Sequence, residues 1–532
     1  NWDVNNIVTN EGLSTSKTQF DVVTYTGNGG TQVIGGEAYS SYGDTTYINS
    51  SYPWAKAFDG VATGVYSAGA GAADGVNWAR WTPPGGIAVS SSLRINTDNG
   101  STSAVKVKFA GQTVQHLTSL SDGWTTVSGT GTLEYIEIYN SGSTWSYLCA
   151  VEIDGTVLID GDGGPGLKFQ PDFVWLKSRS ASQGNILFDS VRGVSKALFT
   201  NNTLAETGQY QKLSSFDTNG FTLTSGTDGS SPNEGNTSSN TYVAWCWKAG
   251  GTAVSNTDGS ITSSVSASSS GGFSIGTYTG TGTAGTIGTG LSGAKMVIIK
   301  NRSTNNTNWI VYHTIVDGSY DYLLLQTTDA NGNSSLTSSL GDTFAVGTTA
   351  DTNASGSNYV FYAFENVPGY QRIGSYTGNG SSTGPVVVTG FKPRFLMIKG
   401  DNTSGWVMYD SERDSVNPNN YRLQANSSGA ESTGDANTNI DFLDNGFQLK
   451  NSDSDSNGSG VTYVYLAIGD DEIGSDEDCL VDVPNAVTAD AGATDTTGGY
   501  QRGNYATLNS NVGATGTTNV TLSNGNLQYA NS

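Results

Sequence analysis

The chain has 532 residues, a formal net charge of −23 at pH 7 and 10% aromatic residues. This length predicts three to five domains, and so acidic a surface disfavours a nucleic-acid partner because it repels phosphate backbones. No apolar run of 18 residues occurs, so we expect no membrane-spanning helix.

The residue pattern indicates an all-β chain. Short Val/Ile/Tyr/Phe runs alternate with Gly/Asn/Ser/Thr/Asp clusters, and long stretches with a helical apolar period are absent. The three cysteines are far apart and odd in number, which argues against a disulfide framework, and Cys246 reads as a small buried residue. We therefore predict tandem β-sandwich domains, assembled without disulfides.

After an N-terminal connector (residues 1–18) the phrase "YTG" opens a unit that recurs twice. In the later copies, Tyr278 and Tyr376 stand 22 and 23 positions before a lysine that closes an apolar strand, Lys300 or Lys399. In the first copy, Tyr25 stands 152 positions before Lys177, which leaves about 129 additional residues. The first unit (19–33 and 165–249) is therefore interrupted by an inserted domain (34–164) at a surface turn.

The remaining boundaries follow from composition and repeat spacing. The Gly/Ser-rich stretch 250–271 is predicted to be a linker, followed by the second unit (272–367) and the third (368–470). A period near 100 residues is too long for a solenoid, so we expect independently folded domains joined in series. Residues 471–532 form a C-terminal extension.

The insert contains an A-F-D-G turn ending at Gly60, a Trp-rich strand "NWARW", and a final strand "VEIDG" ending at Gly155. In order and wording these resemble the discoidin-like, galactose-binding jelly rolls. That resemblance implies a sugar site formed by loops at one end of the sandwich.

The tryptophans of the insert allow two interpretations. As ligand contacts they would form a glycan-stacking surface, because an apolar sugar face packs well on an indole ring; as structural residues they would fill the core of a small sandwich. The candidates are Trp54, Trp78, Trp81, Trp124 and Trp145. Asp59 in the A-F-D-G turn could contribute to a metal site or simply cap the turn, so the metal question stays open.

Residues that could carry catalysis are sparse. His116 and His313 are nearly 200 positions apart and offer little to a zinc site or a Ser-His-Asp triad. The loop Asp453–Gly458 matches the start of a calcium loop but has Val464 at the twelfth position, which favours a solvated hairpin tip. Carboxylate pairs such as Asp441 with Asp444, or Asp410 with Glu412, are not repeated in the other units.

Two arginines are repeated at equivalent places, Arg192 in "FDSVRG" and Arg413 in "YDSERD". A turn-stabilising Arg–Asp pair explains them more simply than a ligand site does. We therefore expect no enzyme activity and no cofactor.

The repeated units resemble β-domains in structural proteins of marine phages, through "FDVVTYTGNG" (from Phe20), "GFKPRFLMIK" (from Gly390), "ILFDSVRG" (from Ile186) and "YVAWCWKAGG" (from Tyr242). The end of the chain, from Gly503, is similar to the lead-in of a SPRY-like domain in such proteins. Either the polypeptide continues beyond Ser532 or the sequence departs from that pattern.

The resemblance implies a virion appendage such as a tail fibre, presenting the insert to a host glycan or receptor, with other virion proteins as partners and a homotrimer as the expected assembly. No coiled-coil heptad supports the trimer. The alternatives are a capsid-decorating or architectural fibre without receptor binding, a polysaccharide-degrading spike, or a cellular adhesin.

Overall fold

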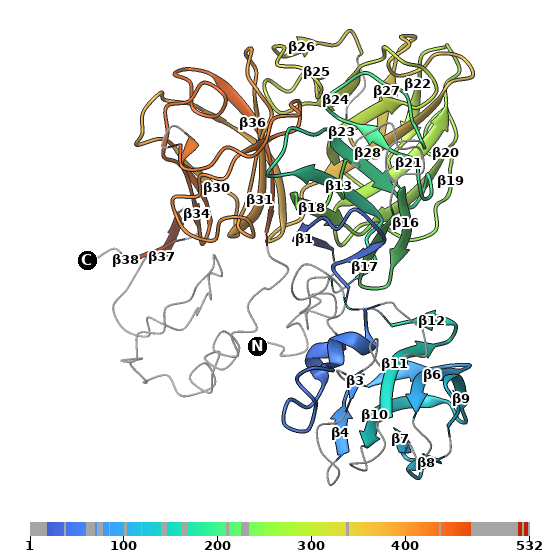
Figure 1. Cartoon of the computed structure of the whole chain (residues 1–532). Coiled ribbons are helices and arrows are strands. Elements are labelled where there is room, and N and C mark those ends of the chain that lie inside the picture. Colours follow the sequence, from blue (N-terminus) through green and yellow to red (C-terminus); the bar gives the residue numbers. More distant parts are fainter. Residues whose placement is uncertain are drawn as a thin grey trace.

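The computed structural model describes residues 19–469, 520–523 and 526–529, apart from short gaps at 37–38, 60–69, 72–77, 84–85, 100–103, 119, 140–145, 159, 161–166, 168, 209–211, 225–233, 337–339 and 436–437. The predicted N-terminal connector lies outside the described residues, as does the extension except for a hairpin of β37 (Val520–Ser523) and β38 (Asn526–Tyr529). The described residues contain antiparallel sheets and no α-helix, which confirms the all-β prediction (Figure 1).

Each of the three repeats has one larger and one smaller sheet. Repeat 1 has the order β1 (Phe20–Thr26), β18 (Thr241–Trp247), β13 (Phe173–Ser178), β14 (Asn185–Asp189), β15 (Leu198–Phe199), with a second sheet of β16 (Lys212–Asp217), β17 (Gly220–Thr224) and β2 (Gln32–Ile34). Repeat 3 has β29 (Gln371–Thr377), β36 (Thr462–Gly469), β31 (Pro393–Gly400), β32 (Val407–Asp410), β33 (Leu423–Gln424), and then β30 (Val386–Val388), β35 (Gly446–Leu449) and β34 (Ile440–Leu443).

In repeat 2 the larger sheet has eight strands. Their order is β19 (Val254–Asn256), β20 (Ser263–Ser268), β21 (Phe273–Thr279), β28 (Asn358–Glu365), β23 (Ala294–Asn301), β24 (Trp309–His313), β25 (Asp321–Leu324) and β26 (Gly332–Asn333), with β22 (Gly285–Gly288) and β27 (Thr343–Val346) forming the second sheet. The prediction of a linker at 250–271 was therefore wrong. Part of this serine-rich segment forms β19 and β20 at the edge of the larger sheet. Its Ile261 and Val265 side chains are buried in the core of repeat 2 and hold the segment there.

The central strands are apolar on both faces because each face meets a different core. In β13, Phe173 and Trp175 point to one core while Val174 and Leu176 point to the other, as the period-2 geometry of a strand requires. The second core is the interior of repeat 1 itself. The first contains residues of all three repeats, including Trp245, Phe364 and Phe395, so the prediction of independent domains in series was wrong.

Equivalent hydrogen bonds connect the repeats into a closed ring. The indole N–H of Trp309 donates to the Phe199 carbonyl at 2.9 Å, and that of Trp406 donates to the Leu324 carbonyl at 2.9 Å. At the third seam Asn185 takes the tryptophan position and donates through Nδ2 to the Gln424 carbonyl at 3.1 Å. These three contacts join repeat 2 to 1, 3 to 2 and 1 to 3.

The recurring "YTG" phrase marks a packing unit. Tyr25 stacks on Tyr242 with 5.1 Å between ring centroids, and the same stack occurs at Tyr278–Tyr359 and Tyr376–Tyr463. The glycine that follows has no room for a side chain: a Cβ at Gly27 would lie 2.4 Å from a backbone carbonyl oxygen. The motif is thus explained by the fold of each repeat.

The insert leaves and rejoins repeat 1 at adjacent residues, because the Leu167 N–H donates to the Gly35 carbonyl at 2.6 Å. Two sheets face each other around a separate core, and Figure 1 shows the insert as its own lobe. One sheet has β4 (Trp78–Trp81), β10 (Gly131–Tyr139), β7 (Ala104–Phe109), β8 (Gln115–Thr118) and β5 (Ile87–Val89); the other has β12 (Thr156–Val157), β11 (Ser146–Ile153), β6 (Leu93–Asn99), β9 (Gly123–Val127) and β3 (Ala70–Gly71). Two short 3-10 turns, η2 (Tyr39–Tyr42) and η3 (Trp54–Ala57), precede them.

Candidate functional site

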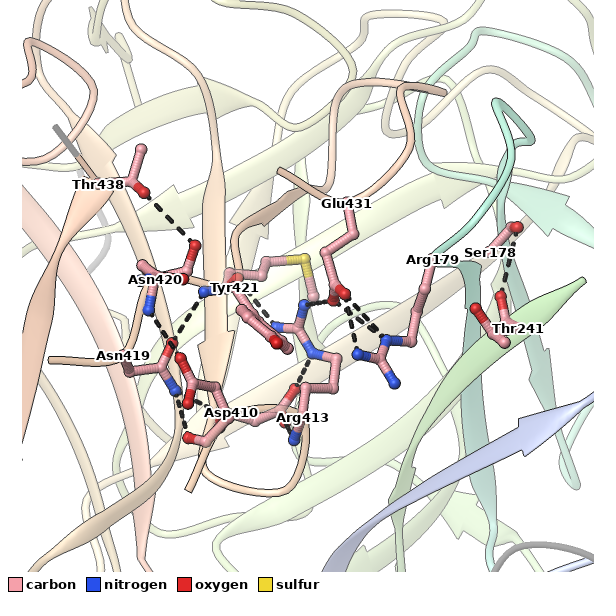
Figure 2. Close-up of polar contacts among 12 residues, drawn as sticks. Ser178, Arg179, Thr241, Asp410, Arg413, Asn419, Asn420, Tyr421, Glu431 and Thr438 are labelled. Atoms are coloured by element: carbon pink, nitrogen blue, oxygen red, sulfur yellow. Dashed lines mark hydrogen bonds and ion pairs between the residues drawn. The ribbon is translucent and has the colours of Figure 1, made fainter. Parts of the chain in front are cut away.

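Clusters of ion pairs lie at the seams between repeats. At the seam between repeats 3 and 1, Arg413 pairs with Asp410 at 2.6 Å and with Glu431 at 2.6 Å, while Arg179 of repeat 1 reaches Glu431 at 2.9 Å. Figure 2 shows Glu431 between the two guanidinium groups. The Arg413 and Asp410 side chains are fully buried and that of Glu431 is nearly so, which leaves only Arg179 in partial contact with solvent.

The same arrangement occurs at the seam between repeats 1 and 2. Arg192 pairs with Asp189 at 2.5 Å and with Glu206 at 3.0 Å, and Arg302 of repeat 2 reaches Glu206 at 2.8 Å. Burial disfavours the charge of Arg192, but Asp189 and Glu206 hold its pKa above the usual value. The predicted Arg–Asp pairs therefore exist, and each extends into a cluster that joins two repeats.

The remaining seam, between repeats 2 and 3, has a different chemistry. His313 stands where Asp189 and Asp410 stand at the other two seams, and its Nε2 lies 3.1 Å from Oδ1 of Asn331. The side chain is buried, and this burial lowers the pKa of His313 despite the nearby carboxylate of Asp321. His313 is thus a packed seam residue, whereas His116 is exposed on the insert.

The strand-ending lysines are also internal. Lys300 donates to the carbonyls of Asn301 and Thr307 at 3.0 Å each, and Lys177 donates to the Gln183 carbonyl at 2.7 Å. Burial lowers the pKa of each lysine, including Lys399, to about 8. Their ammonium groups satisfy loop carbonyls, which would otherwise be buried without partners.

The calcium-like loop is half-buried and not a solvated tip. Asp455 accepts a hydrogen bond from the Gly405 N–H at 2.7 Å, and Asp453 pairs with Arg422 at 3.1 Å. Among the described residues no group of three or more His, Cys, Asp or Glu residues could hold a metal ion.

One member of each candidate carboxylate pair already has a cationic partner: Asp410 belongs to a seam cluster, and Asp441 lies 3.7 Å from Lys450. A cavity where the repeats meet measures about 10 Å³ and is lined by apolar side chains such as Trp175, Trp247 and Tyr362. It offers room for about one water molecule and too little for an organic ligand.

The tryptophans of the insert divide into two groups. Trp54 and Trp81 are buried, and their indole N–H groups donate to the carbonyls of Asp44 (3.0 Å) and Tyr39 (2.7 Å). For these two candidates the structural interpretation holds and the glycan-contact interpretation was wrong, because both complete the core of the sandwich. Trp145 lies outside the described residues, and Asp59 is exposed.

Trp78 lies on the outer face of the β4–β10–β7–β8 sheet. Alternation along "WARW" sends Ala79 and Trp81 inward and leaves Trp78 and Arg80 on the outside. Opposite Trp78 in register is Tyr139, with 4.9 Å between ring centroids, and Lys106 lies over the Trp78 ring at 3.6 Å. An aromatic pair on a sheet surface is a suitable stacking surface for the apolar face of a sugar.

Next to this aromatic pair, charged residues continue across the same face. Glu137 pairs with Arg80 at 2.6 Å and lies 3.5 Å from Lys106. Arg80 in turn covers the ring of Tyr135 at 4.0 Å. We call the residues Trp78, Arg80, Lys106, Tyr135, Glu137 and Tyr139 the platform. Of these six residues the sequence predicted only Trp78, although the outward alternation in "NWARW", "VKVKF" and "LEYIEIY" was a signal for the other five.

Trp124 lies on the outer face of the other sheet, away from Trp78. Arg94 covers its ring at 4.8 Å and pairs with Glu152 at 3.0 Å. The four predicted tryptophans that the structure describes therefore form no single surface. Trp78 lies on a sheet face, so its placement does not support the loop-end site that the resemblance implies.

A family model described as a domain of unknown function, DUF7483, matches residues 154–471, more than half of the chain. The chain belongs to this family. The match covers all of repeats 2 and 3 and the part of repeat 1 that follows the insert. No curated protein and no solved structure matches the chain. Among the described residues, no helix is long and apolar enough to span a membrane.

Proposed function

We propose that this DUF7483 protein is a non-enzymatic virion appendage protein in which the three-repeat ring is a rigid support and the insert binds a host-surface glycan. The observation that carries the glycan assignment is the platform, an aromatic pair flanked by charged side chains on an outer sheet face. The resemblance of the repeat motifs to marine phage structural proteins supports the virion setting.

The chemistry of the ring supports a structural role. Its ion clusters and strand-ending lysines are buried and bonded within the protein, so they stabilise the repeats and offer little to a substrate. Tail fibre, with host attachment through the insert, is the specific role we favour. We also propose a homotrimer, in which each chain contributes its own three-repeat ring.

An architectural role without receptor binding is the second candidate. Val386 and Val388 are more than half exposed on β30, an edge strand of repeat 3. Exposed apolar residues on a sheet edge are typical of contacts between subunits, and such contacts would suit a capsid-decorating or fibre protein.

A glycan array probed with the full chain tests the proposal. We expect binding without release of cleaved saccharide, and we expect Trp78→Ala and Tyr139→Ala to abolish it. Trp124→Ala is the matched control on the opposite face and should leave binding intact. Absence of binding by a folded chain would reject the glycan assignment and favour the architectural role, while cleavage of the saccharide would identify an enzyme.

A further inference from the structure

The platform contains two cations that share one carboxylate. Arg80 Nη2 lies 2.6 Å from Glu137 Oε1, and Lys106 Nζ lies 3.5 Å from Glu137 Oε2. The Glu137 side chain is only 9% exposed, whereas that of Arg80 is 49% exposed. Arg80 is the closer partner of Glu137, so among the described residues of the platform Lys106 carries a positive charge that Glu137 does not balance.

The opposite face of the insert provides an internal comparison. There Arg94 pairs with Glu152 at 3.0 Å in a one-to-one ratio, again beside an indole ring, that of Trp124. An aromatic residue next to an ion pair is thus present on both faces. The platform differs from this pair by its second cation, Lys106.

This cation is unusual for the lobe that carries it. Residues 34–164 contain five basic and twelve acidic residues, and three of the five basic residues (Arg80, Lys106 and Lys108) lie on the strands of this one sheet. Lys108 lies 3.8 Å from Glu134, at the edge of the same face. A positive site within an acidic lobe concentrates anionic groups at that site and repels them elsewhere.

The position of Lys106 favours an acidic ligand over a neutral one. Its ammonium group lies 3.6 Å above the Trp78 ring and covers the surface on which a sugar would stack. A neutral sugar would have to displace this cation without compensation. A carboxylate or sulfate group would attract the flexible lysine side chain to itself and so uncover the ring.

From this geometry we infer that the ligand of the platform is an anionic polysaccharide, with a uronate carboxylate or a sulfate group bound by Lys106 and Arg80 and the adjoining sugar ring packed on Trp78 and Tyr139. The inference rests on the proposed glycan-binding function and specifies the class of glycan.

Binding of the full chain to immobilised alginate and chondroitin sulfate, with dextran as the neutral polymer, tests the inference. We expect binding to at least one acidic polymer and none to dextran. Raising the ionic strength from about 0.05 to about 0.5 M should weaken binding about tenfold or more, because exposed charge interactions are screened.

The variant Lys106→Met isolates the additional charge, because Arg80 and Glu137 then remain as a balanced pair and the fold keeps its ion pair. We expect this variant to lose affinity for acidic polymers about tenfold, and Arg94→Met on the opposite face to change nothing. Binding to dextran alone, or binding to acidic polymers that Lys106→Met leaves unchanged, would overturn the inference while glycan binding stood. Binding to neither polymer class, together with an empty glycan array, would reject both.

Discussion

The hydroxyl group of Tyr362 in repeat 2 donates a hydrogen bond to Asp189 in repeat 1, with 2.8 Å between the oxygen atoms. The equivalent strand position in repeat 1 is Trp245, whose indole N–H donates to Asp410 of repeat 3 at 2.9 Å. In repeat 3 the equivalent strand position is Leu466, which has no donor. The residue of repeat 2 that stands in place of the accepting aspartate is His313. Donor and acceptor are thus present together at two seams and replaced together at the third.

Removing the Tyr362 hydroxyl should weaken the seam between repeats 1 and 2. Asp189 would lose one of its buried donors, and a hydrogen bond to a charged group contributes about 1.5–3 kcal/mol. We expect Tyr362→Phe to lower the free energy of unfolding by that amount in urea denaturation. Tyr47→Phe, at a residue that is 37% exposed, is the control and should have no effect; equal effects of the two would contradict the role of the seam.

Trp309→Ala distinguishes a ring from a row of independent domains. The substitution removes a fully buried indole and its bond to Phe199, which should cost about 3–5 kcal/mol. Because the three repeats share a core, the rate of backbone amide hydrogen exchange should increase in all three repeats together. Increased exchange confined to repeat 2 would show that the repeats unfold separately.

The third seam can be converted to the chemistry of the others. His313→Asp alone should destabilise the protein by several kcal/mol, since it buries a carboxylate without its arginine. Adding Val316→Arg and Leu466→Tyr restores the two partners found at the other seams, and the triple variant should recover much of the lost stability. Strict additivity of the three changes in a mutant cycle would refute this coupling.

The stability of the protein should depend on pH through His313. Burial lowers the pKa of His313 below the ordinary value of 6.5, so the unfolded chain binds a proton before the folded one does. The free energy of unfolding therefore falls as pH drops below about 6.5, towards the lowered pKa. The nearby carboxylates of Asp321 and Asp317 oppose the shift and limit its size.

A comparison of urea midpoints at several pH values between 5 and 7.5, roughly the range in which histidine titrates, checks this dependence. The difference in stability between the wild type and His313→Gln should shrink as the pH falls. His116→Gln, at an exposed histidine of the insert, is the matched substitution outside the seams. A curve for His313→Gln that runs parallel to that of the wild type would show that His313 does not titrate in this range.

The sequence by itself determined the class of fold and the three repeats, because strand alternation and the Tyr-Thr-Gly phrase depend on neighbours a few residues away. It also located the interruption of repeat 1, since the distance between Tyr25 and Lys177 departs from that in the other copies. Cys246 was correctly expected to be buried.

Only the tertiary structure decided which faces meet. Strands such as Phe173–Ser178 are apolar on both sides, and a sequence pattern cannot say whether the second side packs against a sister sheet or against other repeats. For the same reason the tryptophans looked alike in the sequence, yet Trp81 fills a core and Trp78 lies outside. Pairing between distant strands sets the register, and the register brings Lys106 and Tyr139 to Trp78 and thereby creates the platform.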